Sequence, residues 1–243
     1  GEAFAQLGSQ VQIIGVADID RDRAKALSRD LGTRDFIDYR DLCDLEPDVA
    51  VICLPHHLHL EAGLAAARVG SHVLMEKPLA HTLEDALEIV GGCEEHGVLL
   101  ATGFVHRYRA EYQRASEFIE QGFLGALAMA SDSFTFPGGG HVPDWVWQKQ
   151  MAGGGILMYT GIHSVDRLRW LLDSEVDEVY ARAASYSQDS DVEDGLVATM
   201  VFKNGCIGSL VQTQPGYLSK GWGWSTKIYG TDGCLKIRAG EAV

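Results

Sequence analysis

The stretch "SHVLMEKPLAH", residues 71–81, contains the pattern that decides the fold. Its apolar run at residues 73–75 is typical of a buried strand, and the run ends at Glu76, Lys77 and Pro78. Burying a charged pair is costly, and proline cannot donate a hydrogen bond to a strand ladder. The pattern therefore predicts a core strand whose charged end has a purpose other than packing.

Short apolar strands alternate with amphipathic helices around this stretch. We expect strands at residues 11–18, 47–55, 72–78 and 98–104, and helices at residues 20–32, 57–70 and 82–97. Apolar strands that alternate with helices are typical of a parallel sheet with helices on both faces. Residues 1–103 are therefore predicted to form an α/β domain, with Thr82 as the N-cap of its third helix.

The pattern changes in residues 104–243, where aromatic residues become frequent and the strands alternate. We expect a helix at 109–125 and strands at residues 126–136, 176–187, 195–205, 206–214 and 225–237. Asn204-Gly205 and Asp232-Gly233 are signals for hairpin turns. This half is therefore predicted to be a second, α+β domain with a large, mostly antiparallel sheet.

A further helix is expected within residues 153–172, between these strands. Its inward-facing apolar residues are Ile162, Val165, Leu168 and Leu172. Packing of this kind does not explain His163 or the glycines at residues 153–155, which makes them candidates for a site.

The composition excludes several classes of protein. The chain has 243 residues, of which 46% are hydrophobic, and its net charge is −14. Nucleic acids and anionic membranes both need a basic surface, so neither is an expected partner. No apolar run is as long as a membrane span, and neither a membrane span nor a signal peptide is expected from these residues. The five scattered cysteines are expected to be reduced thiols, as in a cytoplasmic protein.

Polar or turn residues end three of the expected strands: Asp18; Leu54, Pro55 and His56; and Glu76, Lys77 and Pro78. Parallel sheets bind ligands at the carboxyl ends of their strands, so the pattern predicts a nucleotide crevice. Asp18 could accept hydrogen bonds from a ribose, or it could cap the helix that begins near Asp20. The sequence before Asp18 contains no G-x-G-x-x-G motif, which predicts weak dinucleotide binding by these residues alone.

The sequence resembles the glucose–fructose oxidoreductase/inositol dehydrogenase (GFO/IDH/MocA) family in five successive blocks. They are "VADIDRDRAKAL", "VAVICLPHHLH", "HVLMEKPLA", "GFVHRYRAEYQRASEFIEQGFLG" and "GGGILMYTGIHSVDRLRWLL". The resemblance implies a Rossmann-like domain over residues 1–103 and a substrate and oligomerisation domain over residues 104–243. It also implies NAD(P)-dependent hydride transfer to or from a sugar, polyol or related substrate, by a homo-oligomer that forms through the open sheet.

The resemblance also implies roles for single residues. Lys77, before a cis Pro78, would bind and polarise the substrate hydroxyl, and Glu76 would hold it in place. His163 would exchange the hydroxyl proton. Arg107 would be a further substrate contact or a structural residue. The implied cofactor contacts are Asp18, Leu54, Pro55, His56, His59, Glu76, Lys77 and Pro78.

The resemblance also implies three features of the cofactor and substrate site. Asp18 favours NAD, although Arg21 nearby could hold the phosphate of NADP. Lys77 and His163 are expected to face one crevice, with Asp18 along the same sheet edge. Tyr159 stands where the family has an aspartate, and its phenol could donate a proton or orient the substrate.

Other interpretations of the same residues stay open. Tyr159 and the missing glycine loop would also suit a non-catalytic binding module of the same fold. His56, His57 and His59 suggest a metal-dependent hydrolase, but no cysteine or acidic cluster accompanies them, so no metal site is expected. Weaker candidates for a sugar site are Trp145, Trp147, Trp222, Trp224 and His141.

Overall fold

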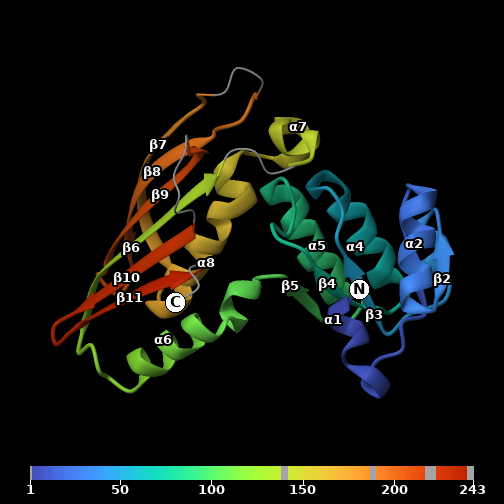
Figure 1. The fold of residues 1–243 in the computed structure, drawn as a ribbon, viewed down its shortest axis with the longest axis horizontal. Helices are drawn as coiled ribbons and strands as arrows, with labels where there is room; N and C mark the ends of the chain where they lie inside the picture. Colours follow the sequence, from blue (N-terminus) through green and yellow to red (C-terminus); the bar gives the residue numbers. More distant parts are fainter. Residues whose placement is uncertain (1, 138–141, 187–189, 217–222, 240–243) are drawn as a thin grey trace. The chain divides into compact units, whose positions relative to one another are not determined.

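The computed structural model describes residues 2–137, 142–186, 190–216 and 223–239 (Figure 1). The chain forms two compact units. Unit 1 comprises residues 1–54 and 58–102, and unit 2 comprises residues 55–57 and 103–243. Each unit has its own hydrophobic core.

The strands of unit 1 form two parallel sheets. One sheet pairs β1 (Gly15–Ala17) with β2 (Arg34–Phe36). The other has the order β3 (Val49–Ile52), β4 (His72–Met75) and β5 (Leu100–Thr102). Every pairing in both sheets is parallel, which confirms the predicted α/β class.

Helices connect these strands. They are α1 (Glu2–Ala5), α2 (Arg21–Leu31), α3 (Tyr39–Cys43), α4 (His59–Arg68) and α5 (Leu83–Glu95). α4 packs against β3, β4 and α5, and Ala67, Met75 and Ile89 are fully buried in this core. The predicted cap is confirmed, because the Thr82 hydroxyl accepts a hydrogen bond from the Asp85 N–H at 3.1 Å.

Two elements of unit 1, β2 and α3, are absent from the sequence-based prediction. Arg34 and Asp35 of β2 are exposed, so no apolar run marks this strand. α3 is a short helix whose N-cap is Asp38. Contacts of β2 with β1 and α2, and of α3 with β1 and α4, rather than periodicity, position the two elements.

Unit 2 is built on one six-stranded sheet with the order β11-β10-β6-β9-β8-β7. Its strands are β6 (Leu127–Pro137), β7 (Val176–Ala184), β8 (Gly195–Phe202), β9 (Ile207–Gly216), β10 (Gly223–Gly230) and β11 (Cys234–Ala239). All pairings are antiparallel except the parallel pair β6–β9, so the predicted mostly antiparallel sheet is confirmed. Both predicted hairpin turns are present, joining β8 to β9 and β10 to β11.

Helices pack against one face of this sheet (Figure 1). They are α6 (Ala110–Glu120) and α8 (Ile162–Leu171), while α7 (Lys149–Ala152) and the π-helical turn η5 (Leu157–Gly161) precede α8 in the chain. The core between helices and sheet includes Ile156, Leu168, Phe202, Leu210 and Ile228. Side chains on the opposite face, such as Val197 (57% exposed), are open to solvent.

A charged network lies within the core of unit 2. The side chains of Arg167 in α8 and Asp132 in β6 have no exposed surface, and Arg167 Nη2 lies 2.9 Å and 2.8 Å from the two Asp132 oxygens. Thr226 of β10 donates its hydroxyl to Asp132 at 2.5 Å. Arg167 also donates to Ser164 Oγ at 3.0 Å. The network therefore joins α8, β6 and β10.

Close packing explains the glycines at residues 153–155, contrary to the sequence-based interpretation. A Cβ at Gly155 would lie 1.8 Å from the carbonyl oxygen of Glu193. The Glu193 carboxylate accepts hydrogen bonds from the N–H groups of Gly155 and Leu157, at 2.8 Å and 3.1 Å. Gly153 has φ +83°, in the left-handed region that glycine adopts without strain. An acidic group thus satisfies the start of the helix that leads to His163.

Two global expectations can also be compared with the structure. All five cysteines are free, as expected of reduced thiols. Within the described ranges, no helix combines the length and apolar character needed to cross a bilayer.

Replacing one partner of the buried ion pair should destabilise the protein more than replacing both. Arg167→Met leaves the Asp132 carboxylate without a cation, and Asp132→Leu leaves the guanidinium without an anion. Each should cost about 3–5 kcal/mol, whereas the double variant should lose far less than their sum. Urea unfolding of the four proteins measures this coupling. Strictly additive losses would mean that the two side chains stabilise the fold independently.

Candidate functional site

The predicted Lys77 and Pro78 lie just after β4, which ends at Met75. The Lys77-Pro78 peptide bond is cis, as expected. Lys77 is partly buried, and its backbone N–H donates to the Glu76 carboxylate at 3.2 Å. Burial lowers the pKa of Lys77, and the negative charge of Glu76 partly offsets this shift. A desolvated ammonium acts more strongly on a bound oxygen than one surrounded by water.

His59 ties together the chain segments that follow β3 and β4. Its side chain is completely buried. Nε2 lies 2.9 Å from the carbonyl oxygen of Leu54, and Nδ1 lies 3.1 Å from that of Pro78. His59, which is predicted to contact the cofactor, is therefore surrounded by backbone carbonyl groups. It positions the segments that follow β3 and β4.

Asp18 directly follows β1. Asp20, and not Asp18, is the N-cap of α2, because its carboxylate accepts from the N–H groups of Asp22 and Arg23. Asp18 Oδ1 accepts from the Asp20 N–H at 2.8 Å and from the Arg23 guanidinium at 3.0 Å. The Asp18 side chain is 36% exposed, and within the described part of the chain its Oδ2 has no hydrogen-bond partner. An open carboxylate oxygen at the end of a parallel strand fits the ribose diol of a dinucleotide.

His163 lies at the start of α8 in unit 2. Its side chain is buried, and its ring stacks face to face on that of His106, with centroids 4.2 Å apart and planes at 6°. Phe104 and Trp224 stand nearly perpendicular to it, each with a centroid distance of 6.2 Å. Aromatic rings therefore fix the orientation of this candidate proton carrier.

Tyr159 lies in the π-helical turn η5, four residues before His163. A π-helical turn changes the register of its side chains relative to the α-helix that follows. Tyr159 is partly buried, and this burial raises the pKa of its phenol. The phenol therefore stays protonated near neutral pH, where it can donate a hydrogen bond but cannot act as a base.

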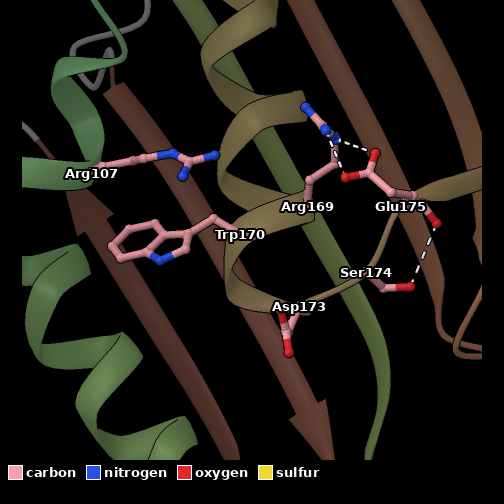
Figure 2. Close-up of a pocket in the computed structure, with 6 residues that line it drawn as sticks. All are labelled: Arg107, Arg169, Trp170, Asp173, Ser174 and Glu175. Atoms are coloured by element: carbon pink, nitrogen blue, oxygen red, sulfur yellow. Dashed lines mark hydrogen bonds and ion pairs between the residues drawn. The ribbon is translucent and has the colours of Figure 1, made fainter. Parts of the chain in front are cut away.

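Arg107 is paired with Asp166 of α8, its Nε and Nη2 lying 2.9 Å and 2.6 Å from the two carboxylate oxygens. This pairing raises the pKa of Arg107. Figure 2 shows the cavity that Arg107 lines together with Arg169, Trp170, Asp173, Ser174 and Glu175. Arg169 is paired with Glu175 in the same bidentate way, at 2.8 Å and 2.6 Å. Because a carboxylate engages each guanidinium, the geometry favours the structural role of Arg107 over a substrate contact.

The remaining candidate residues are divided between the two units. Leu54 belongs to unit 1, whereas Pro55 and His56 cluster with unit 2. His56 is buried, with Nδ1 3.0 Å from the Ala152 carbonyl oxygen, and its ring is nearly perpendicular to that of Trp145. In the part of the chain that the structure describes, no group of histidine, cysteine and acidic side chains could hold a metal ion. His141 and Trp222 lie outside the described residues.

Sequence reasoning missed His106 and Arg167, which lie next to His163. The helical pattern assigns Arg167 to solvent, because only apolar side chains are expected to point inward. One signal could have found it. Asp132 stands between Ala130 and Phe134 at an inward position of an alternating strand, and a buried acid needs a cation nearby.

Two family models match most of the chain. Residues 1–104 match the model described as "Oxidoreductase family, NAD-binding Rossmann fold". Residues 112–236 match the model described as "GFO/IDH/MocA C-terminal domain".

Individual proteins are similar over much of the chain. A 1,5-anhydro-D-fructose reductase from Ensifer adhaerens is 33% identical over 193 residues, which are 79% of this chain and 57% of that protein. The structure of levoglucosan dehydrogenase in complex with NADH has a TM-score of 0.85 and 26% identity, covering 93% of this chain and 63% of that one. The WlbA dehydrogenase from Bordetella pertussis, in complex with NADH and UDP-GlcNAcA, has a TM-score of 0.88 and 27% identity, covering 100% of this chain and 73% of that one.

The chain spans 57%, 65% and 62% of the lengths of three of its curated relatives. The N-terminal family model matches the unit with the parallel strands and the open Asp18 carboxylate, and the C-terminal model matches the unit with the six-stranded sheet. On these matches, the chain belongs to the GFO/IDH/MocA family of NAD-binding oxidoreductases.

Proposed function

We propose that the protein is an oxidoreductase that moves hydride between NAD and a hydroxyl or carbonyl group of a sugar, polyol or related compound. The observation that carries this proposal is Lys77, a partly buried ammonium with a lowered pKa at the end of a parallel strand. The names of two relatives support the substrate class, since both 1,5-anhydro-D-fructose and levoglucosan are sugar derivatives. The free thiols support a cytoplasmic location.

Lys77 and His163 act on the same substrate oxygen. Lys77 donates a hydrogen bond to this oxygen and stabilises the negative charge that develops when the hydroxyl is oxidised. His163 takes the hydroxyl proton during oxidation and returns it during reduction. NAD, when bound, accepts or supplies the hydride. Glu76 helps to keep Lys77 charged, since its carboxylate opposes the effect of burial.

Asp18 holds the adenosine ribose of the cofactor. Its Oδ2 accepts the ribose hydroxyl hydrogen bonds, while Oδ1 stays bound to the Asp20 N–H and to Arg23. A negative charge at this position repels the extra phosphate of NADP, so NAD is the preferred cofactor. The further contacts proposed for the cofactor are the strand-end residues Leu54, Pro55, His56 and Pro78, with His59 as their support.

Tyr159 orients the substrate. Because burial raises the pKa of its phenol, it contributes a neutral hydrogen bond where a carboxylate would contribute a charge. The loss of that charge leaves His163 without an acidic neighbour at this position, so the proton passes between His163 and the substrate oxygen directly.

The protein forms a homo-oligomer through the exposed face of the unit 2 sheet. The strand registers align an apolar row on this face, made of Met129, Val201, Ile207 and Tyr229. The row beside it contains the small hydroxyl side chains of Ser131, Thr199 and Ser209. An exposed row of apolar side chains on a sheet face is typical of an interface. A second copy of the same face is the proposed partner, because twofold symmetry lets two identical sheets pack together.

Changes at the two proposed catalytic residues should slow turnover strongly. Lys77→Met and His163→Gln should each lower kcat by about 10²–10⁴-fold, as expected for acid–base and electrostatic catalysis. Tyr159→Phe should lower it only about tenfold, because it removes one neutral hydrogen bond. Steady-state assays with sugar and polyol substrates measure these effects.

Exposed residues of the same types provide matched controls for this series. Lys25→Met and His96→Gln should retain normal turnover. If Lys77→Met and His163→Gln also retained it, the chemistry would lie elsewhere. A protein that bound sugars but had no turnover at all would instead support the binding-module interpretation.

Removing the charge of Asp18 should change the cofactor preference. Asp18→Ser should weaken NAD binding by about 10–100-fold, because hydrogen bonds to a charged group are lost, and should weaken NADP binding less. Asp30→Ser, on the exposed surface of α2, is the control for the change in net charge. Titration calorimetry with both cofactors measures the ratio of dissociation constants. An unchanged ratio would exclude Asp18 from the ribose site.

A charge on the exposed sheet face should dissociate the oligomer. Ile207, in β9, is 44% exposed in the apolar row, and Ile207→Glu would bury a carboxylate in the proposed interface. Leu83→Glu, on α5 of unit 1, makes the same kind of change at a residue that is 69% exposed. Sedimentation analysis should give a lower mass for Ile207→Glu and an unchanged mass for Leu83→Glu. Equal masses for all three proteins would place any interface elsewhere.

A further inference from the structure

Three aromatic rings are stacked in a column inside unit 2. His106 lies in the middle, 4.2 Å from the ring centroid of His163 and 5.9 Å from that of Tyr112. The planes are nearly parallel, at 6° and 12° respectively. Trp224 closes one side of the column, perpendicular to His106 at a centroid distance of 4.5 Å. The ring of His106 therefore has almost no freedom to tilt or rotate.

Arg167 determines where His106 carries its proton. Arg167 Nη1 lies 2.5 Å from His106 Nδ1. A guanidinium has hydrogen-bond donors and no acceptor, so Nδ1 must offer its lone pair to Arg167. The ring proton of His106 is then on Nε2. A second proton on Nδ1 would place two donors and two positive charges against each other, so this contact keeps His106 neutral.

The guanidinium itself is held in place from several directions. Asp132 binds Nη2 through both carboxylate oxygens, and Ser164 Oγ accepts from the same nitrogen. The guanidinium carbon also lies 4.9 Å from the ring centroid of Tyr112 and 5.4 Å from that of Trp224. The order of support therefore runs from Asp132 through Arg167 and His106 to His163.

We propose that His106 is a positioning residue for His163: a neutral imidazole whose fixed ring holds the ring plane of the proton carrier. The proposal rests on the proposed function, in which His163 exchanges a proton with the substrate. Because Arg167 prevents a second proton on His106, His163 is the one member of the stacked pair that changes its charge. The face of a neutral aromatic ring also attracts a cation, so this stack tolerates the protonated form of His163, whereas two imidazolium rings would repel each other.

The first test uses the unmodified protein and needs no substrate. Nitrogen-15 NMR of labelled histidine should show His106 with one protonated and one unprotonated ring nitrogen, unchanged between about pH 5 and pH 8, the range in which histidines usually titrate. A His106 signal that titrates within this range would overturn the proposal.

Two substitutions separate the stacked ring from the hydrogen-bond acceptor. His106→Gln keeps an acceptor for Arg167 but removes the ring, and His106→Phe keeps the ring but removes the acceptor. His96→Gln is the control, because it makes the same substitution at the exposed C-cap histidine of α5, which lies outside the column of rings. For each variant, the ring proton resonances of His163 and the values of kcat and KM should be measured.

Loss of the ring should be more harmful to turnover than loss of the acceptor. His106→Gln should move the His163 ring resonances and lower kcat by about 10–100-fold, the effect of a slightly misplaced catalytic group, with little change in KM. His106→Phe should restore both the resonances and most of kcat, and His96→Gln should change neither.

If His106→Gln left both readouts unchanged, or if His106→Phe were as slow as His106→Gln, stacking would not position His163. These outcomes are distinct from a failure of the proposed function, which would appear as normal turnover in His163→Gln. The NMR readouts would still decide the state of His106 in that case.

Discussion

The ion pair between Arg167 and Asp132 is the constraint on which unit 2 depends. Neither side chain reaches solvent, and desolvating each ion costs several kcal/mol before their attraction compensates. Such a pair contributes little net stability, but it tolerates only one arrangement of the elements that carry it. α8, β6 and β10 must meet in that arrangement, and the ring column that includes His163 is built against the same guanidinium.

The proposed catalytic groups of the two units are supported in different ways. His163 is held by aromatic faces and, through His106, by a buried charge network. Lys77 is held by backbone, since it sits at a strand end that His59 ties to the neighbouring segment through carbonyl oxygens. His59 and His106 are both buried, so water competes little with these supports, and a side chain supported in this way keeps its geometry.

Much of this protein could be predicted from its sequence, because periodicity and turn chemistry are local. The apolar runs before Pro55 and Pro78 predict the paired parallel strands β3 and β4. Asn204-Gly205 predicts the hairpin turn between β8 and β9. Nothing local marks β2, since its two exposed charges follow no apolar pattern. The burial of Arg167 depends on Asp132, which lies 35 residues away in the chain, and a helical pattern cannot reveal such a partner.

Both edges of the unit 2 sheet carry charges. β7, at one edge, is exposed along nearly its whole length and includes Asp177, Glu178 and Arg182. β11, at the other, exposes Lys236 and Arg238. Unpaired edge strands can recruit further strands, and charged side chains at the edge oppose this by keeping water around the open backbone groups. These charges therefore oppose sideways growth of the sheet into a fibre, and they leave its broad face, where the proposed interface lies, as the surface for a closed association.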